Sequence, residues 1–225
     1  MAPAENLKKR KIAVLGSRSV GKSSLVIQFI DNQFVESYYP TIEATFAKSV
    51  KYKGAEYDCE VIDTAGQVRP SEEEQFVSVS LSCMLQDEFS ILNSKHAIGI
   101  HGYVLVYSVT SKASFDMIQI VYDKIIGFCG VTDIPCVVVG SKVDLESRYA
   151  CSCFFLVLAK LQSSRQVSSQ EGEKLAREIN AAWLETSAKT NLNVGKVFES
   201  CLAEIEKRAP HAGEPPQSSR GCVVM

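Results

Sequence analysis

Little in the sequence would take the chain out of the cytosol. The basic residues Lys8-Lys9-Arg10-Lys11 are followed by an apolar run only as long as a strand, so the N-terminus does not resemble a signal peptide. The apolar run from Phe154 to Ala159 is too short to span a bilayer. A formal net charge of −2 gives no reason to expect a nucleic-acid polymer as the partner.

The cysteines indicate neither a disulfide framework nor a zinc site. Without a secretory signal, the eight cysteines are expected to be reduced thiols. Cys151 and Cys153 have no second Cys/His pair nearby at a zinc spacing. With 46% apolar and 22% charged residues in 225, the composition is that of one soluble domain with additions.

The strongest motif is a phosphate-binding loop near the N-terminus. It has the pattern G-x-x-x-x-G-K-S and reads Gly16-Ser17-Arg18-Ser19-Val20-Gly21-Lys22-Ser23. An apolar strand precedes it and a helical stretch from Ser24 to Asn32 follows, which is the context that a P-loop needs. Its backbone N–H groups can surround anionic oxygens, Lys22 can bind the outer phosphates, and the Ser23 hydroxyl can ligate magnesium.

A second motif follows a predicted hairpin. Residues Glu56 to Ile62 alternate polar and apolar side chains after a turn at Gly54, which predicts a strand paired with Thr45–Lys53. That strand leads into Asp63-Thr64-Ala65-Gly66-Gln67. An aspartate there can hold a metal ion through water, and the glycine can bring its backbone to a terminal phosphate.

The rest of the chain predicts alternating strands and helices. Ser168 and Glu171 have the spacing of a helix capping box. The predicted strands are 103–109, 136–140 and 181–185, and the predicted helices are 114–128, 171–180 and 194–205. This alternation predicts a mostly parallel sheet covered on both faces, with the ligand loops at the carboxyl ends of the strands.

Together these motifs resemble a Ras-like small GTPase. The P-loop, Pro40-Thr41, D-T-A-G-Gln67, Ser141-Lys142-Val143-Asp144 and Ser187-Ala188-Lys189 occur in the order and roughly the spacing of that family. The resemblance covers residues 11–67, 87–147 and 164–207 and implies the α/β P-loop NTPase fold, three layers with a six-stranded, mostly parallel sheet. Arg18, where most Ras proteins have glycine, suggests the branch that activates the TOR kinase.

The resemblance implies a phosphate and magnesium site with GTP/GDP and Mg²⁺ as ligands. The P-loop residues that would contact the phosphates are Gly16, Ser17, Arg18, Ser19, Val20, Gly21, Lys22, Ser23 and Ser24. Ser23 and Thr41 would ligate magnesium, with Asp63 behind them through water. The catalytic set would be Lys22, Thr41, Gly66, which contacts the γ-phosphate, and Gln67, which positions the attacking water.

The resemblance also implies a guanine site. Asp144 would accept two hydrogen bonds from guanine, Lys142 would pack on the base, and Ala188, between Ser187 and Lys189, would donate its amide to the guanine oxygen. Tyr38 and Pro40 would lie beside the nucleotide, and Thr41 would belong to a switch that is ordered only with the γ-phosphate and magnesium.

Two residues depart from the family pattern. Ser141 stands where asparagine is usual, so we expect the preference for guanine to persist with weaker binding. Arg18 would crowd the attacking water, so we expect slow intrinsic hydrolysis.

Two segments fit no part of the family. They are residues 68–86, directly after Gln67, and residues 148–163, after Asp144. Our hypothesis is that both are translated introns, because the codon for Val68 begins with GT and a codon for Gln86 can end with AG. A mature transcript that contains both would refute it. The alternative is a genuine elaboration of the switch.

The predicted domain organisation has three parts. They are a flexible arm 1–10, a GTPase domain 11–207 that the two segments interrupt, and a flexible tail 208–225.

The tail ends in Cys222-Val223-Val224-Met225, a C-a-a-X box that predicts a farnesyl group on Cys222. A single lipid gives only reversible binding, so we expect a monomer on the cytoplasmic face of membranes with a cytosolic pool. The resemblance implies a GTPase-activating protein and a TOR-type effector kinase as partners.

Two rival functions remain. If segment 68–86 disables Gln67, the chain is a nucleotide-binding scaffold without effective GTP hydrolysis. A P-loop ATPase or nucleotide kinase is disfavoured by Ser141-Lys142-Val143-Asp144 and Ser187-Ala188-Lys189.

Overall fold

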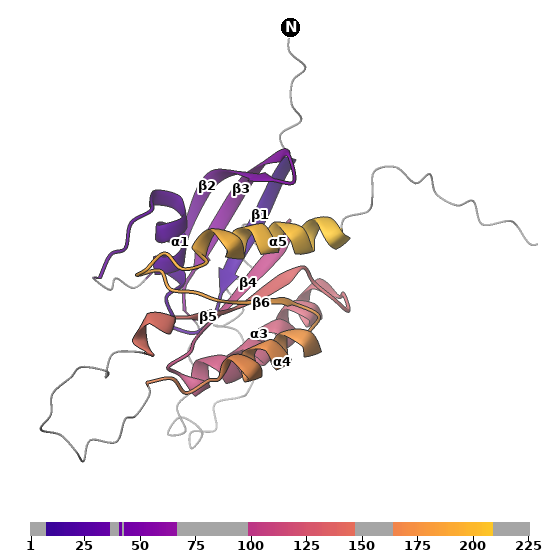
Figure 1. The fold of residues 1–225 in the computed structure, drawn as a ribbon. Helices are drawn as coiled ribbons and strands as arrows, with labels where there is room; N and C mark the ends of the chain where they lie inside the picture. Colours follow the sequence, from indigo (N-terminus) through magenta and orange to yellow (C-terminus); the bar gives the residue numbers. More distant parts are fainter. Residues whose placement is uncertain (1–7, 37–40, 42, 67–98, 147–163, 209–225) are drawn as a thin grey trace, which may run out of the picture.

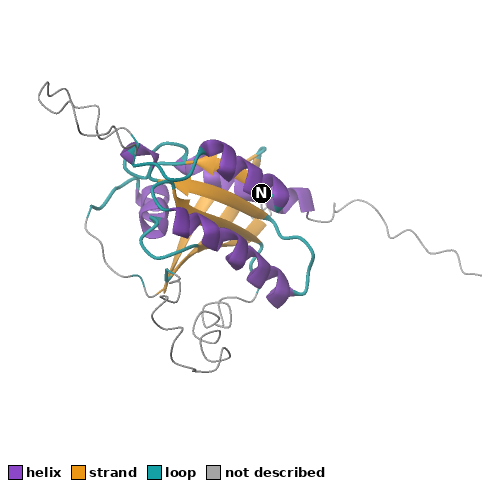
Figure 2. Cartoon of the chain, turned by 90° about the horizontal axis from the view of Figure 1, so that it is seen from below, coloured by secondary structure: helices purple, strands orange, loops and turns teal. Residues whose placement is uncertain are grey.

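A six-stranded sheet forms the centre of the molecule (Figures 1 and 2). The computed structural model describes residues 8–36, 41, 43–66, 99–146 and 164–208. The strand order is β2-β3-β1-β4-β5-β6. Strand β2 (Glu43–Tyr52) is antiparallel to β3 (Ala55–Thr64), and all other neighbouring strands are parallel. The predicted hairpin and the mostly parallel sheet are therefore confirmed.

The central strands are the most apolar because helices cover both of their faces. Every residue of β4 (Gly102–Ser108) and β5 (Cys136–Ser141) is buried. Strand β1 (Lys8–Leu15) lies between β3 and β4, and the short β6 (Ala182–Glu185) forms one edge. Parallel strands end on the same side, so the loops after β1, β3, β5 and β6 gather at one end of the sheet.

The helices form the two outer layers. Helices α1 (Lys22–Asp31) and α5 (Val194–Arg208) cover one face, where Phe29 and Phe198 stack with their ring centroids 3.8 Å apart. Helices α3 (Lys112–Cys129) and α4 (Ser169–Glu178) cover the other, and the short 3-10 helix η2 (Val143–Leu145) follows β5. The predicted three-layer α/β fold is confirmed.

Two local predictions meet different outcomes. The capping box is present, because the Ser168 hydroxyl accepts from the Glu171 amide and the Glu171 carboxylate accepts from the Ser168 amide. The arm predicted over residues 1–10 is wrong at its end, because β1 begins at Lys8. The cations of Lys8 and Arg10 are accommodated there by Glu206 and lie 5.5 and 5.8 Å from the ring centroid of Tyr57.

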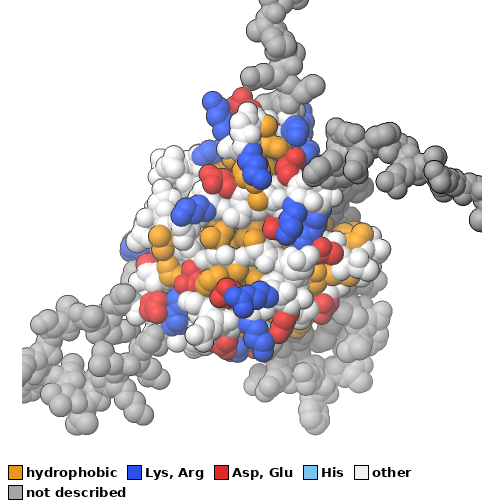
Figure 3. Space-filling view, turned by 45° about the vertical axis from the view of Figure 1, so that its right-hand side comes forward, with side chains coloured by type: hydrophobic (Ala, Val, Ile, Leu, Met, Phe, Trp, Pro, Cys, Tyr) orange, Lys and Arg blue, Asp and Glu red, His pale blue; other side chains and the backbone are white. Residues whose placement is uncertain are grey.

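The surface mixes charges of both signs. On the face shown in Figure 3, basic and acidic side chains are interspersed with small apolar areas. Among the described residues, Lys112 and Glu171 form one such pair of opposite charges, with 2.9 Å between Nζ and Oε1. Among the described helices, none has both the length and the apolar character needed to cross a bilayer.

Candidate functional site

The P-loop follows β1 in a conformation that its glycines make possible. Gly16 has φ +147°, and a Cβ there would lie 2.1 Å from the carbonyl oxygen of Val106 in β4. Gly21, directly before α1, has φ +102°. Gly16 is required by both its backbone angle and the close approach, and Gly21 is favoured by its backbone angle alone. The loop therefore lies close against β4 as it leaves the carboxyl end of β1 and leads into α1.

Lys22 lies within the loop rather than in solvent. Its side chain is buried, and Nζ donates to the carbonyl oxygens of Gly16 and Ser17, each at 3.0 Å. Burial lowers the pKa of Lys22 to about 8, an effect that the nearby carboxylate of Asp63 partly opposes. A cation that is poorly solvated and aimed into an anion-binding loop is well suited to bind phosphate.

Three oxygen-bearing side chains meet where magnesium is predicted. The hydroxyl oxygens of Ser23 and Thr41 are 2.7 Å apart, and Ser23 also hydrogen-bonds to Asp63 at the end of β3. Asp63 is 3% exposed, and its Oδ1 finds no hydrogen-bond partner among the described residues. Burial raises the pKa of Asp63, whereas Ser23 and Lys22 lower it. A buried carboxylate oxygen without a partner beside two hydroxyls fits a hard cation such as magnesium.

Gly66 lies directly against the P-loop. A Cβ at this position would be 2.4 Å from Cα of Arg18, so no larger residue fits without moving the backbone. The end of β3 is fixed by Thr64, whose hydroxyl donates to the carbonyl oxygen of Val14 at 2.8 Å. These contacts place Gly66 beside the loop that carries Lys22.

The residues predicted to bind guanine lie on the loops after β5 and β6, which we call the guanine-side loops. Lys142 adopts φ +65°, and its Nζ donates to the carbonyl oxygen of Ser19 at 2.6 Å. Burial lowers the pKa of Lys142, partly opposed by Asp144. The Ser187 hydroxyl donates to Oδ1 of Asp144 at 2.7 Å. Asp144 and the loop that carries Ala188 are therefore held together.

Ser141, which stands where the family usually has asparagine, connects β5 to the P-loop. Its Oγ lies 2.5 Å from the carbonyl oxygen of Val20 and 2.8 Å from that of Tyr107. A serine hydroxyl has one proton, so it can donate fully to only one of these acceptors. The connection between β5 and the P-loop is thus retained in a weaker form.

Two residues near the site were missed by sequence reasoning. Phe34 is 37% exposed, and Nζ of Lys189 lies 5.9 Å from its ring centroid, while Lys189 also pairs with Glu36 at 3.0 Å. Arg165 binds two carboxylates behind the guanine-side loops. An exposed aromatic residue just after α1 and an arginine at the resumption of the family pattern were the available signals.

Several predicted residues lie outside the described part of the chain. They are Tyr38, Pro40, Gln67 and Cys222, together with segments 68–86 and 148–163.

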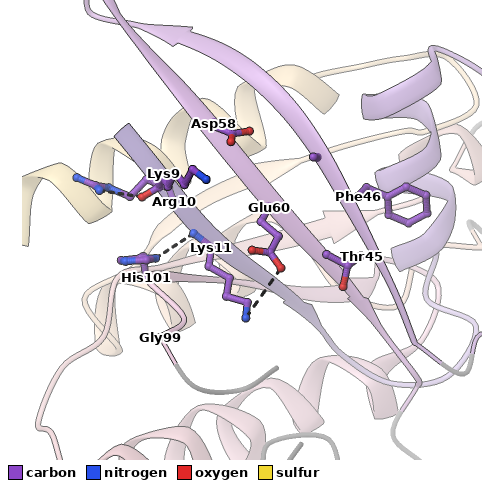
Figure 4. Close-up of a pocket in the computed structure, with 10 residues that line it drawn as sticks. Lys9, Arg10, Lys11, Thr45, Phe46, Asp58, Glu60, Gly99 and His101 are labelled. Carbon is purple, nitrogen blue, oxygen red and sulfur yellow. Dashed lines mark hydrogen bonds and ion pairs between the residues drawn. The ribbon is translucent and has the colours of Figure 1, made fainter. Parts of the chain in front are cut away.

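A groove of about 400 Å³ lies away from these loops, along one face of strands β1, β2 and β3 (Figure 4). Lys11 pairs with Glu60 there at 3.9 Å, and its backbone N–H donates to Nδ1 of His101 at 2.9 Å. None of the described residues that line the groove belongs to the predicted nucleotide set. The predicted nucleotide residues lie instead on the loops at the carboxyl end of the sheet.

Comparison with known proteins identifies the class. The family model described as Ras family matches residues 11–85 and 84–207, so the chain belongs to the Ras family of small GTPases. Such proteins bind GTP with magnesium and hydrolyse it to GDP and phosphate, and so does this chain.

Within the family the chain is Rheb-like. It is 50% identical over 224 residues to the GTP-binding protein rhb1 of Schizosaccharomyces pombe, with all of both chains covered. It is 45% identical over 218 residues to the small monomeric GTPase RhbA of Aspergillus fumigatus, which covers 97% of each chain. It is 41% identical over 218 residues to the GTP-binding protein Rheb of Homo sapiens, covering 97% of this chain and 98% of that one.

Proposed function

We propose that the chain is a lipid-anchored GTP/GDP switch in which the P-loop holds the phosphates and Asp144 selects guanine. The observation that carries this proposal is the convergence of the loops after β1, β3, β5 and β6. Lys142 reaches the carbonyl of Ser19, and Ser141 reaches that of Val20, so the guanine-side loops meet the phosphate loop. Phosphate and base would therefore bind at opposite ends of one site.

Magnesium would be held by Ser23 and Thr41, with Asp63 behind them, and would neutralise charge on the β- and γ-phosphates. Gly66 would contact the γ-phosphate through its amide, and Gln67 would orient the attacking water. Because Thr41 already lies 2.7 Å from Ser23, loss of the γ-phosphate and magnesium would release the segment around Thr41. That release is the conformational signal to partners.

The guanine assignment can be tested by exchanging the base. Asp144 is proposed to accept from the N1–H and the 2-amino group of guanine, so Asp144→Asn places a donor where xanthine carries a second oxygen. We expect the affinity for GDP to fall by about a hundredfold and the affinity for xanthosine diphosphate to rise. Asp123→Asn on the exposed face of α3 is the matched control. Unchanged GDP binding in Asp144→Asn would contradict the assignment.

Cys222 is proposed to carry a farnesyl group that places the protein on cytoplasmic membrane faces. Mass spectrometry of the C-terminal peptide from cells should show the lipid, and Cys222→Ser should move the protein to the soluble fraction. An unmodified Cys222 in membrane-bound protein would refute the anchor.

The proposed partners are a GTPase-activating protein and a TOR-type effector kinase. The Rheb-like sequence supports this pairing, and the switch around Thr41 would make effector binding specific for GTP. Capture of the kinase by GTP-loaded but not GDP-loaded protein would test it, and equal capture by both forms would reject it.

Family membership favours a hydrolysing switch over a scaffold without turnover. Single-turnover GTP hydrolysis of the full chain and of a chain lacking 68–86, each with and without an activating protein, tests this directly. If the shortened chain hydrolysed GTP and the full chain did not, the full chain would belong to the scaffold class.

A further inference from the structure

The guanidinium of Arg165 lies between the carboxylates of Glu185 and Glu146 and donates hydrogen bonds to both. Its two terminal nitrogens donate to the two carboxylate oxygens of Glu185 at 2.7 and 3.1 Å, and one of them also donates to Glu146 at 2.9 Å. The side chains of Arg165 and Glu185 are 13% and 20% exposed. A bidentate pair that is largely shielded from water is far stronger than an ordinary surface ion pair.

The two carboxylates belong to the two loops that would read the base. Glu185 is the last residue of β6, two residues before Ser187. Glu146 follows η2, two residues after Asp144. Arg165 therefore joins the strand that leads into one loop to the residue at the end of the other.

The loops also make direct contacts, which Arg165 flanks. The amide of Val143 donates to the carbonyl oxygen of Thr186 at 3.3 Å, and the amide of Thr186 donates to that of Gly140 at 2.8 Å. Nearer the site, the Ser187 hydroxyl holds Asp144 at 2.7 Å. This short hydroxyl contact depends on the separation of the two loops, and Arg165 bridges a carboxylate on each side of it.

We propose that Arg165 is a positioning residue for guanine recognition, which fixes Asp144 and the loop of Ala188 relative to each other without contacting the nucleotide. The inference rests on the proposed assignment of Asp144 to guanine. An arginine is required because its planar fork serves two carboxylates at once, whereas a lysine ammonium is a single point charge. Removing it would leave Glu185, which is 20% exposed, without its bidentate partner and next to a second carboxylate, that of Glu146.

The test compares GDP with inosine diphosphate, which lacks the 2-amino group that Asp144 would bind. Dissociation of both nucleotides is measured on the full chain and on Arg165→Met, Arg165→Lys and Arg177→Met. Arg177 is the matched control, because its side chain is 75% exposed and pairs with Glu173 one turn earlier on α4.

We expect the unaltered chain to hold GDP at least about tenfold more tightly than inosine diphosphate, which is the value of one hydrogen bond to a charged acceptor. In Arg165→Met this ratio should fall below about threefold, because a displaced Asp144 loses the 2-amino contact. Arg165→Lys should give an intermediate ratio, and Arg177→Met should leave it unchanged.

A merely structural role would weaken both nucleotides equally, so an unchanged ratio in Arg165→Met overturns the proposal. Should that variant fail to fold, Glu146→Gln decides, since Glu146 is 46% exposed and its loss removes one arm of the fork. It should lower the ratio by about twofold, and an unaltered ratio there also overturns the proposal. Failure of the guanine assignment looks different, because the unaltered chain would then show no preference for GDP.

Discussion

The hydroxyl of Ser141 lies 2.5 Å from the carbonyl oxygen of Val20, 121 residues earlier in the chain. This contact joins the end of β5 to the P-loop and depends on one proton shared between two acceptors, because the carbonyl oxygen of Tyr107 is also 2.8 Å away. At Ser141 the base loop is thus coupled to the phosphate loop by a single hydroxyl proton, in addition to the contact of Lys142 with Ser19.

Ser141 gives a prediction with opposite signs for two substitutions. Ser141→Ala removes the donor and leaves two buried carbonyls less satisfied, so GDP should dissociate about five- to tenfold faster. Ser141→Asn offers two N–H donors for the two acceptors and should slow dissociation. Release of a fluorescent GDP analogue measures both. Faster release from Ser141→Asn than from the unaltered chain would show that the serine is already the better fit.

Lys22 predicts a pH dependence of nucleotide binding. Its pKa is lowered to about 8 by burial, and phosphate binding favours the charged form, so binding takes up a proton once the free protein has lost it. The affinity for GDP should therefore be flat below pH 8 and fall by up to about tenfold per pH unit above it.

Lys22→Arg is the control for this prediction, since a guanidinium keeps its charge over the whole range. Its absolute affinity will differ, but its pH profile should lack the decline. Affinities measured by titration from pH 6.5 to 9.5 at constant ionic strength decide the matter, and parallel profiles for the two proteins would exclude Lys22 as the titrating group.

The order of strands, helices and motif loops could be predicted from the sequence because each depends on local patterns. The P-loop glycines, the alternation before Asp63 and the capping box at Ser168 all act over a few residues. They fix which strand end carries which loop, and the parallel sheet then brings those ends together.

Contacts that depend on side-chain reach between distant segments could not be predicted. The hydrogen bond of Lys142 to Ser19 in the P-loop and the ion pair of Arg165 with Glu185 depend on the three-dimensional path of the loops. Short sequence patterns do not determine that path. The start of β1 was missed for a related reason. Lys8 and Arg10 look like a solvated arm until Glu206 of α5 is placed beside them.

Gly66 predicts a separation of binding from hydrolysis. In Gly66→Ala the new methyl group would lie 2.4 Å from Cα of Arg18, which forces the end of β3 away from the P-loop. The three atoms nearest to this methyl group all belong to Arg18, so GDP affinity should stay within about threefold while single-turnover GTP hydrolysis falls at least about tenfold.

The matched control is Gly127→Ala in α3, where a Cβ meets no atom within 4 Å. It should leave both binding and hydrolysis unchanged. If Gly66→Ala hydrolysed GTP at the rate of the control, the close approach of Gly66 to the P-loop would have no part in the reaction.

We predict that the segment of residues 148–163 can be deleted with little effect on nucleotide binding. The chain on its two sides is joined by the Ser164 hydroxyl, which donates to the carbonyl oxygen of Leu145, and by the contact of Arg165 with Glu146. Removing residues 148–163 leaves all four of these residues in place. GDP dissociation should therefore stay within about twofold of the full chain, because the guanine-side loops keep their own supports. In the shortened chain, Arg165→Met should still lower the preference for GDP over inosine diphosphate. A tenfold faster release on deletion alone would mean that the segment itself, rather than the fork of Arg165, holds the two loops in place.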